Sequence, residues 1–101
     1  NPDAPENQNF VSKYQAMMDG VIPNQFAADG YDVIYAIYDA CIACGIDGAT
    51  PADEACEKLN EYFATYTFSG LTGSGMGWTT AGEISKTPMV VEIVDGAYVN
   101  M

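Results

Sequence analysis

Apolar residues in the first half of the chain recur at helical spacing and predict two helices there. One helix is expected from about Asn7 to Met18, because apolar positions lie three and four residues apart and a glycine follows. A second helix is expected to run to about Cys44, with Asn24 as its N-terminal cap and Gly45 as the residue that ends it. The apolar stripe of this second helix comprises Val33, Ile34, Ile37, Tyr38, Cys41 and Ile42.

A third helix has the clearest start signal in the chain. Thr50 is the expected cap, Pro51 suits the first helical position, and Asp53 and Glu54 favour the positive end of the helix. The helix is expected to continue to about Ala64. Its buried side is predicted to contain Ala55, Cys56, Leu59, Tyr62 and Phe63.

Strand-like sequence is confined to the last third of the chain. A segment rich in glycine, threonine and serine offers only a short strand near Met76–Thr79. The run Met89–Val94 predicts a strand, Asp95-Gly96 a two-residue turn, and Ala97–Val99 the returning strand. The expected fold class is α/β, with three helices followed by a β-hairpin. Because a two-stranded hairpin is marginal alone, these elements are expected to pack against more of the protein or a second copy.

Length and composition indicate one small globular domain at most, and we treat residues 1–101 as a single partial domain. Hydrophobic residues make up 49% of the 101 positions, yet no apolar run is long enough to span a membrane. The chain opens on Asn1-Pro2-Asp3, which is neither a signal peptide nor an initiator methionine. The natural protein is therefore expected to begin upstream.

The charge of the chain is strongly acidic. Three lysines and no arginine stand against fourteen aspartates and glutamates, which gives a net charge of −11. Such a chain has almost nothing with which to neutralise phosphate, so nucleic acid and anionic membranes are not expected partners. Histidine, the commonest general base, is absent as well, which lowers the expectation of catalysis.

Three cysteines allow a redox reading and a plain structural one. Cys41 and Cys44 have the spacing of a redox motif, and Cys56 leaves an odd count that cannot complete a disulfide framework. The pair lies late in an apolar helix and not at a helix N-terminus, where a thiolate would be stabilised. Small buried side chains are therefore the favoured interpretation. Zinc would need four ligands, and three cysteines without histidine make a poor set.

Other candidate motifs fail on their chemistry. The segment 69–75 is glycine-rich but lacks the Gly-Lys-Ser/Thr ending of a phosphate loop. Asp29, Asp32 and Asp39 lack the alternating spacing of a calcium loop and are interpreted as a solvated helix face. Ser74 has no histidine to activate it. We expect no catalytic residues, no metal site and no cofactor, and the chain is predicted not to be an enzyme.

Six short motifs follow one another along the chain. They are Phe10-Val11-x-x-Tyr14 followed by Pro23, Phe26-Ala27-Ala28-Asp29-Gly30-Tyr31-Asp32, Ala40 with Ala43 and Gly45, Phe68-Ser69-Gly70-Leu71-Thr72-Gly73, Trp78-Thr79-Thr80-Ala81-Gly82-Glu83, and Val91-Glu92-Ile93-Val94-Asp95-Gly96. Taken in this order, they resemble the C-terminal part of type I periplasmic solute-binding proteins, and most closely the branched-chain amino-acid type of ABC importers. The stretch between the fourth and fifth motifs is one residue longer than in the family, and the chain lacks arginine.

The resemblance implies a role in solute uptake. Family members have two α/β lobes that close on a ligand, here an amino acid or a similar small polar solute, and deliver it to an ABC permease. They are extracellular or periplasmic, often as cell-surface lipoproteins. The resemblance places Tyr31 at the edge of the cleft, where its ring and hydroxyl can contact ligand, and Gly30 beside it, where backbone can approach closely.

Alternatives remain open at this point. Tyr31 shares one helical face with Tyr35 and Tyr38, and such a stripe also fits the edge of a core or a simple packing role. The same fold serves as the ligand-sensing domain of receptors, and a small thiol redox protein using Cys41 and Cys44 is a further alternative. The isolated fragment is expected to bind its ligand weakly or not at all, and to self-associate through exposed apolar faces.

Overall fold

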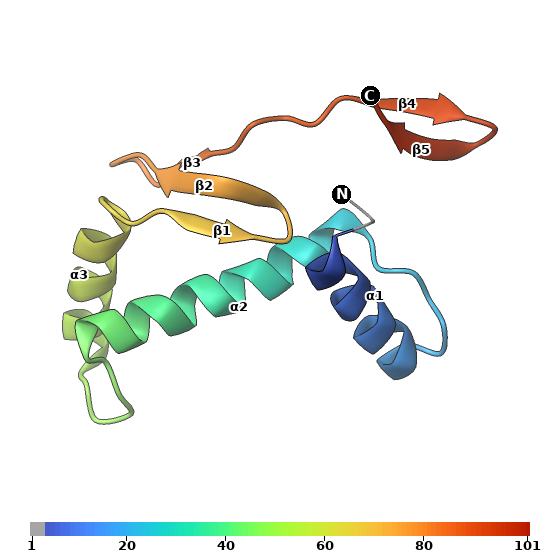
Figure 1. Ribbon diagram of the computed structural model, residues 1–101. Helices are drawn as coiled ribbons and strands as arrows, with labels where there is room; N and C mark the ends of the chain where they lie inside the picture. The colour runs from blue at the N-terminus through green and yellow to red at the C-terminus, as the bar shows by residue number, and fades with distance from the viewer. Residues whose placement is uncertain (1–3) are drawn as a thin grey trace. The chain divides into compact units, whose positions relative to one another are not determined.

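Three helices followed by five short strands make up the chain in the computed structural model, which describes residues 4–101 (Figure 1). The strands form two antiparallel sheets, one of three strands and one of two. The chain divides into two compact units, Pro23–Lys86 and the pair of terminal segments Asn1–Ile22 and Thr87–Met101. The elements are α1 (Pro5–Met17), α2 (Gln25–Cys44), α3 (Ala52–Phe63), β1 (Phe68–Gly70), β2 (Gly73–Trp78), β3 (Ile84–Ser85), β4 (Val91–Val94) and β5 (Ala97–Asn100). The predicted order of three helices before antiparallel strands is confirmed.

Helix α2 begins and ends where the sequence predicts. The Asn24 side chain accepts a hydrogen bond from the Ala27 backbone N–H at 3.0 Å, which satisfies one of the free donors of the first turn. Gly45 ends the helix in the left-handed conformation, with φ of 64°. The Ile46 N–H then reaches back to the Cys41 carbonyl at 2.9 Å, which closes the last turn.

The start of α3 differs from the prediction. Pro51 is the residue before the first helical position, and Thr50 does not cap the helix. The Thr50 hydroxyl instead accepts a hydrogen bond from the Asp47 N–H at 3.1 Å and lies 3.3 Å from the Asp47 carboxylate. A tight turn from Asp47 therefore competes for the side chain that the sequence assigned to the helix. Cys56 is exposed, which corrects the prediction that it is buried on this helix.

The segment after α3 holds more strand than its composition suggests. Strand β1 pairs with β2, with Phe68 opposite Met76 and Gly70 opposite Gly73, and β2 pairs in turn with β3. The single short strand predicted near Met76–Thr79 is thus the end of a six-residue strand with a partner on each side. Glycine and serine hide the pattern because they add no alternating hydrophobicity.

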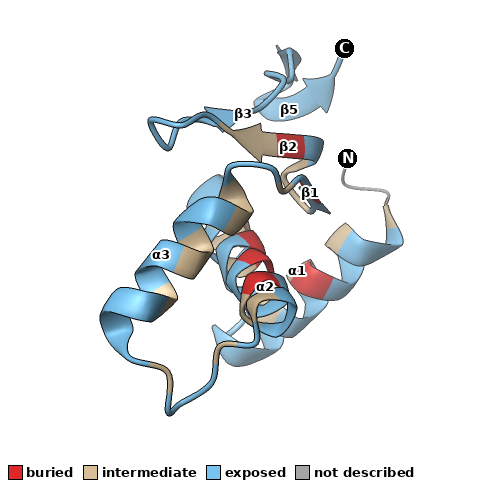
Figure 2. Ribbon diagram, turned by 90° about the vertical axis from the view of Figure 1, so that its left-hand side faces the viewer, coloured by how far each residue is buried: buried red, intermediate tan, exposed pale blue. Residues whose placement is uncertain are grey.

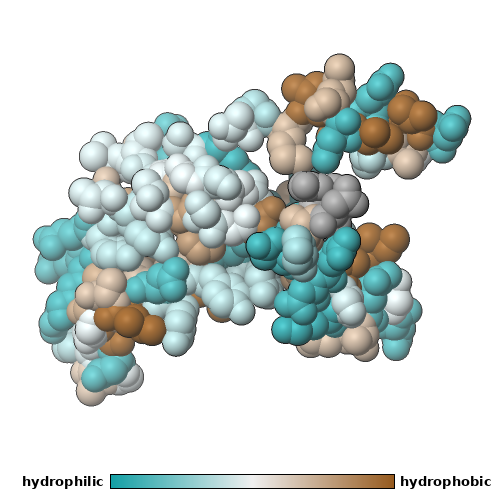
Figure 3. Space-filling model, viewed as in Figure 1, coloured by the Kyte–Doolittle hydropathy of each residue, from teal (hydrophilic) through white to brown (hydrophobic). Residues whose placement is uncertain are grey.

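The terminal hairpin agrees with the prediction. Strands β4 and β5 pair antiparallel with Val94 opposite Ala97, joined by Asp95 and Gly96 at φ of 50° and 82°. Two central residues with positive φ are the signature of a type I′ turn. Every residue of both strands is exposed, and Figure 3 shows apolar side chains gathered on this hairpin.

The side of α2 that packs inward is not its apolar stripe. The predicted stripe is exposed except for Cys41, which is partly buried, whereas the buried residues of the helix are Asp32, Ala36 and Ala40. These buried positions line one side of α2 in Figure 2. Ala36 packs with Phe68 and Met76 of the small sheet, and Phe63, Tyr66 and Trp78 surround that cluster. Small side chains allow this close approach. The positions of the largest apolar residues therefore predicted the wrong side of α2 as the buried one.

Removing the cap of α2 tests how much that local signal stabilises the fold. Asn24→Ala deletes the acceptor for the Ala27 N–H, and we expect it to lower the free energy of unfolding by about 1 kcal/mol. Urea denaturation followed by circular dichroism measures the change. Asn24→Ser keeps an acceptor and serves as control, so equal losses in both variants would contradict a capping role.

Candidate functional site

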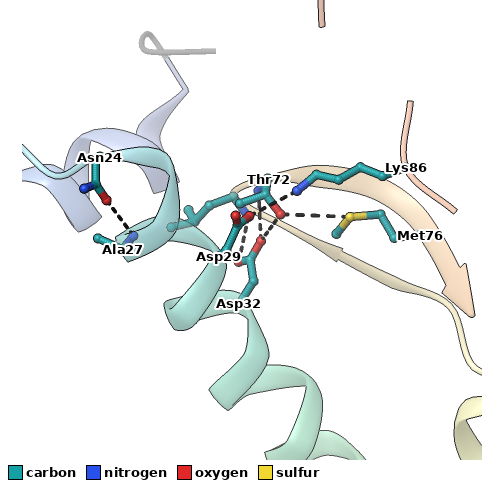
Figure 4. Close-up of polar contacts among 8 residues, drawn as sticks. Asn24, Ala27, Asp29, Asp32, Thr72, Met76 and Lys86 are labelled. Atoms are coloured by element: carbon teal, nitrogen blue, oxygen red, sulfur yellow. Dashed lines mark hydrogen bonds and ion pairs between the residues drawn. The ribbon is translucent and has the colours of Figure 1, made fainter. Parts of the chain in front are cut away.

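Asp32 is the one buried acidic residue among those described, and it joins α2 to the β1–β2 turn (Figure 4). Asp32 is only 6% exposed to solvent. One carboxylate oxygen accepts a hydrogen bond from the Leu71 N–H at 2.9 Å. The other accepts from the Thr72 N–H at 2.9 Å and from the Thr72 hydroxyl at 2.7 Å. Three donors from a single turn compensate the cost of burying the carboxylate. We call this arrangement the Asp32 clamp.

The clamp corrects the interpretation of the three aspartates of α2 as a solvated face in the case of Asp32, whereas Asp39 is exposed and Asp29 partly exposed. Asp32 is buried, and the other two also have partners from downstream segments. The Tyr66 hydroxyl donates to Asp39 at 2.9 Å, and the Lys86 ammonium pairs with Asp29 at 3.1 Å. All three carboxylates thus hold the segment after α3 against one side of the helix. The alanines interspersed with them were the available signal, because small residues on a helix permit close packing.

Gly70 is required by the clamp. A Cβ atom built there would lie 2.5 Å from a carboxylate oxygen of Asp32 and 2.6 Å from the Phe68 ring. No side chain fits at those distances, so the turn can approach the helix only with glycine at this position. The same geometry argues against phosphate binding by the segment 69–75. The backbone donors of Leu71 and Thr72 that could bind an anion already bind the carboxylate of Asp32.

A cluster of aromatic side chains packs β2 against α3 and the residues that follow it. Tyr66 stacks on Trp78 with their planes 5° apart and ring centroids 6.2 Å apart, and it stacks on Tyr62 at 4.7 Å. Phe63 meets Trp78 edge-on at 4.9 Å. Burial, with a further contribution from the hydrogen bond to Asp39, raises the pKa of Tyr66 from 10.0 to about 12.

Tyr31 and Gly30, the predicted ligand-binding residues, lie in the second turn of α2, next to the clamp. The Tyr31 hydroxyl is 3.4 Å from that of Tyr35, and their rings are 4.9 Å apart. This hydrogen bond, with smaller effects of burial and of nearby charge, raises the pKa of Tyr31. Gly30 has open space where a side chain would begin, so its surroundings do not themselves exclude a larger residue.

A separate groove of about 740 Å³ opens between α2, α3 and the turn after β2. Its lining is largely apolar, and Glu61 is its one charged residue. Neither Tyr31 nor Gly30 lines it. The groove could accept an apolar side chain or ring, and the edge-on pair of Phe63 and Trp78 would form one wall. The lining residues are Val33, Ala36, Ile37, Asn60, Glu61, Phe63, Ala64, Trp78, Thr79, Thr80 and Gly82.

The three cysteines are free thiols in the structure. Cys41 and Cys44 are partly buried, and the Cys44 thiol donates a weak hydrogen bond to the Lys58 carbonyl at 3.7 Å. Among residues 4–101, no three acidic, histidine or cysteine side chains are grouped to hold a metal ion. Over the same residues, none of the helices combines the length and apolar character needed to cross a membrane.

No protein-family model, curated protein or solved structure matches the chain.

Replacing the buried carboxylate tests the clamp. Asp32→Asn puts an amide where the Leu71 and Thr72 donors converge, so at least one donor loses its acceptor. We expect the free energy of unfolding to fall by about 2–3 kcal/mol, as measured by urea denaturation. Asp29→Asn is the control, because the partly exposed pair with Lys86 contributes less than about 1 kcal/mol. Faster amide exchange at Leu71 and Thr72 in Asp32→Asn alone would locate the effect, and equal destabilisation by both variants would refute it.

The raised pKa of Tyr66 predicts alkaline destabilisation. Its proton is held more tightly in the folded chain than in the unfolded chain, where the pKa is 10.0. The stability from Tyr66 is therefore complete below pH 10.0 and is lost as the pH rises towards about 12. Tyr66→Phe should flatten this decline in the free energy of unfolding. Tyr98→Phe, on the exposed hairpin, should keep it, and a decline unchanged in Tyr66→Phe would contradict the assignment.

Proposed function

We propose that this chain is part of an extracellular solute-binding protein, the substrate-binding component of an ABC importer for amino acids of the branched-chain type or a similar small polar solute. The observation that carries the proposal is the Asp32 clamp. It joins two of the segments whose sequences resemble that family, the one that ends in Gly30-Tyr31-Asp32 and the one that contains Gly70-Leu71-Thr72, across about 40 residues of chain.

The clamp makes the two motifs depend on each other. Asp32 supplies the acceptor, the turn supplies three donors, and Gly70 leaves the space in which they meet. This physical interdependence supports treating the two motifs as one structural unit.

A third motif has a structural reason for its glycine. In the turn between β2 and β3, the Thr79 N–H donates to the Glu83 carbonyl at 2.9 Å, and the Glu83 N–H donates to the Thr79 hydroxyl at 3.1 Å. Gly82 has φ of 86°, a conformation that glycine adopts without strain. The glycine of the aromatic-x-x-x-Gly-acid pattern therefore has a role in a specific turn, to which Glu83 contributes through its backbone, and this adds some weight to the resemblance.

The proposed mechanism is binding without covalent chemistry. Ligand enters between two lobes and favours the closed state that the permease recognises. Tyr31 directly precedes Asp32, so the clamp fixes the helical turn from which its side chain projects. Its hydroxyl is neutral at neutral pH, because the hydrogen bond with Tyr35 raises an already alkaline pKa. A neutral phenol offers an apolar ring and a hydrogen bond to a zwitterionic ligand.

Amino-acid binding by the gene product that contains these residues tests the proposal. Calorimetry with leucine, isoleucine, valine and a panel of polar amino acids should reveal a ligand, and Tyr31→Ala should weaken its binding about tenfold, the effect of one lost polar and ring contact. Tyr38→Ala, an exposed tyrosine two turns further along α2, is the control and should bind normally.

The 101-residue chain alone gives the second arm of this test. We expect it to bind the same ligand weakly or not at all, because the proposal assigns the principal contacts to another part of the receptor. Tight amino-acid binding by the chain alone, or a gene product that binds none of the panel, would overturn the proposal. Equal losses in Tyr31→Ala and Tyr38→Ala would remove Tyr31 from the site.

A further inference from the structure

The charged and large apolar residues of α2 lie on opposite sides of the helix. Its three aspartates face the rest of their own unit, where each has a partner. Six large apolar side chains point the other way and are 43–70% exposed. Helices of globular proteins normally have the reverse arrangement, with the apolar side inward. We call this set the outer face of α2, and it comprises Phe26, Val33, Ile34, Ile37, Tyr38 and Ile42.

The outer face is continuous and uncharged. At 3.6 residues per turn, its six residues cover an arc of about 180°, and no charged residue of α2 falls within that arc. Gly30 lies inside the arc with open space around its Cα atom. A second helix could therefore approach closely at this point, packing against the branched side chains of Val33, Ile34 and Ile37.

We propose that the outer face of α2 is a self-association surface on which α2 of a second copy of this chain packs. With about 200 Å² for a large side chain, the six residues expose on the order of 700 Å² at their observed exposed fractions. A stable interface needs about 800 Å² from each partner, a value that Gly30, Cys41 and the adjoining groove would help to reach. Because the outer face is apolar along its whole length, the outer face of a second copy can pack against it.

Charge favours a second copy over a basic partner. A basic protein would be drawn to carboxylates, and those of α2 are directed inward to Leu71, Thr72, Tyr66 and Lys86. The outer face has no charge to select such a partner. Two copies that each have a net charge of −11 repel one another, so salt should strengthen their association. Binding of a basic partner would show the opposite dependence on salt.

Sedimentation of the 101-residue chain over a range of concentrations tests the proposal. We expect a monomer–dimer equilibrium that shifts towards dimer when salt is added. Ile34→Glu places a charge at the centre of the outer face and should weaken dimerisation at least about tenfold. Ala43→Glu adds the same charge to an exposed site outside the arc, and it should leave the dimer intact.

Circular dichroism of both variants establishes whether each remains helical, because a misfolded variant would lose the dimer trivially. If Ile34→Glu does not fold, Ile34→Ser provides the milder change at the same position, with a smaller but measurable loss of dimer. A monomer at every concentration and salt level would overturn the proposal, as would equal weakening by Ala43→Glu. Dimerisation requires no ligand, so sedimentation without amino acid tests it separately from the proposed function, although Gly30 belongs to both surfaces.

Discussion

The position of one carboxylate determines how the unit Pro23–Lys86 is assembled. Asp32 accepts every hydrogen bond that the Leu71 and Thr72 donors offer to α2, and its oxygen lies where any side chain on residue 70 would have to be. The sheet can therefore dock only in one register against the helix, with Phe68 and Met76 set over Ala36. Hydrophobic contact alone does not specify a register, because it has no direction. The directional bonds of Asp32 supply that specificity.

The same use of acidic groups explains an unusual distribution of charge. With only three lysines in the chain, most carboxylates cannot form ion pairs, and α2 directs its aspartates to neutral donors and to Lys86. Polar side chains usually turn outward and keep a helix soluble. Here they hold the segment after α3, and the large apolar residues are left outward. Internal cohesion and the exposed apolar surface are thus two results of a single arrangement.

Local signals in the sequence predicted the helices and the terminal hairpin well. Asn24, Gly45 and the Asp95-Gly96 turn act through bonds and dihedral angles within a few residues, so pattern alone identifies them. The burial of α2 was predicted wrongly, because the inward side is chosen by a turn about 40 residues away. Thr50 was misassigned for a related reason, since the Asp47 turn competes for its hydroxyl.

The sequence predicts the candidate site less completely than it predicts the fold. Tyr31 and Gly30 were singled out by resemblance, and their positions beside the clamp leave their role in binding a prediction. The sequence does not predict the structural role of Asp32, because an aspartate on a helix usually faces water. The spacing of Asp32 with Ala36 and Ala40 contained the available hint, yet nothing local to α2 identifies the donors that meet the carboxylate.

The long separation between Asp32 and its donors has a consequence for the order of folding. The Asp95-Gly96 hairpin and the helices involve only near neighbours, and such elements form within about 10 μs or faster. The clamp requires closing a loop of about 40 residues before any of its hydrogen bonds can form. Docking of the β1–β2 turn onto α2 is therefore expected to be the late, cooperative step, and helical signal should rise before Trp78 reaches its native surroundings.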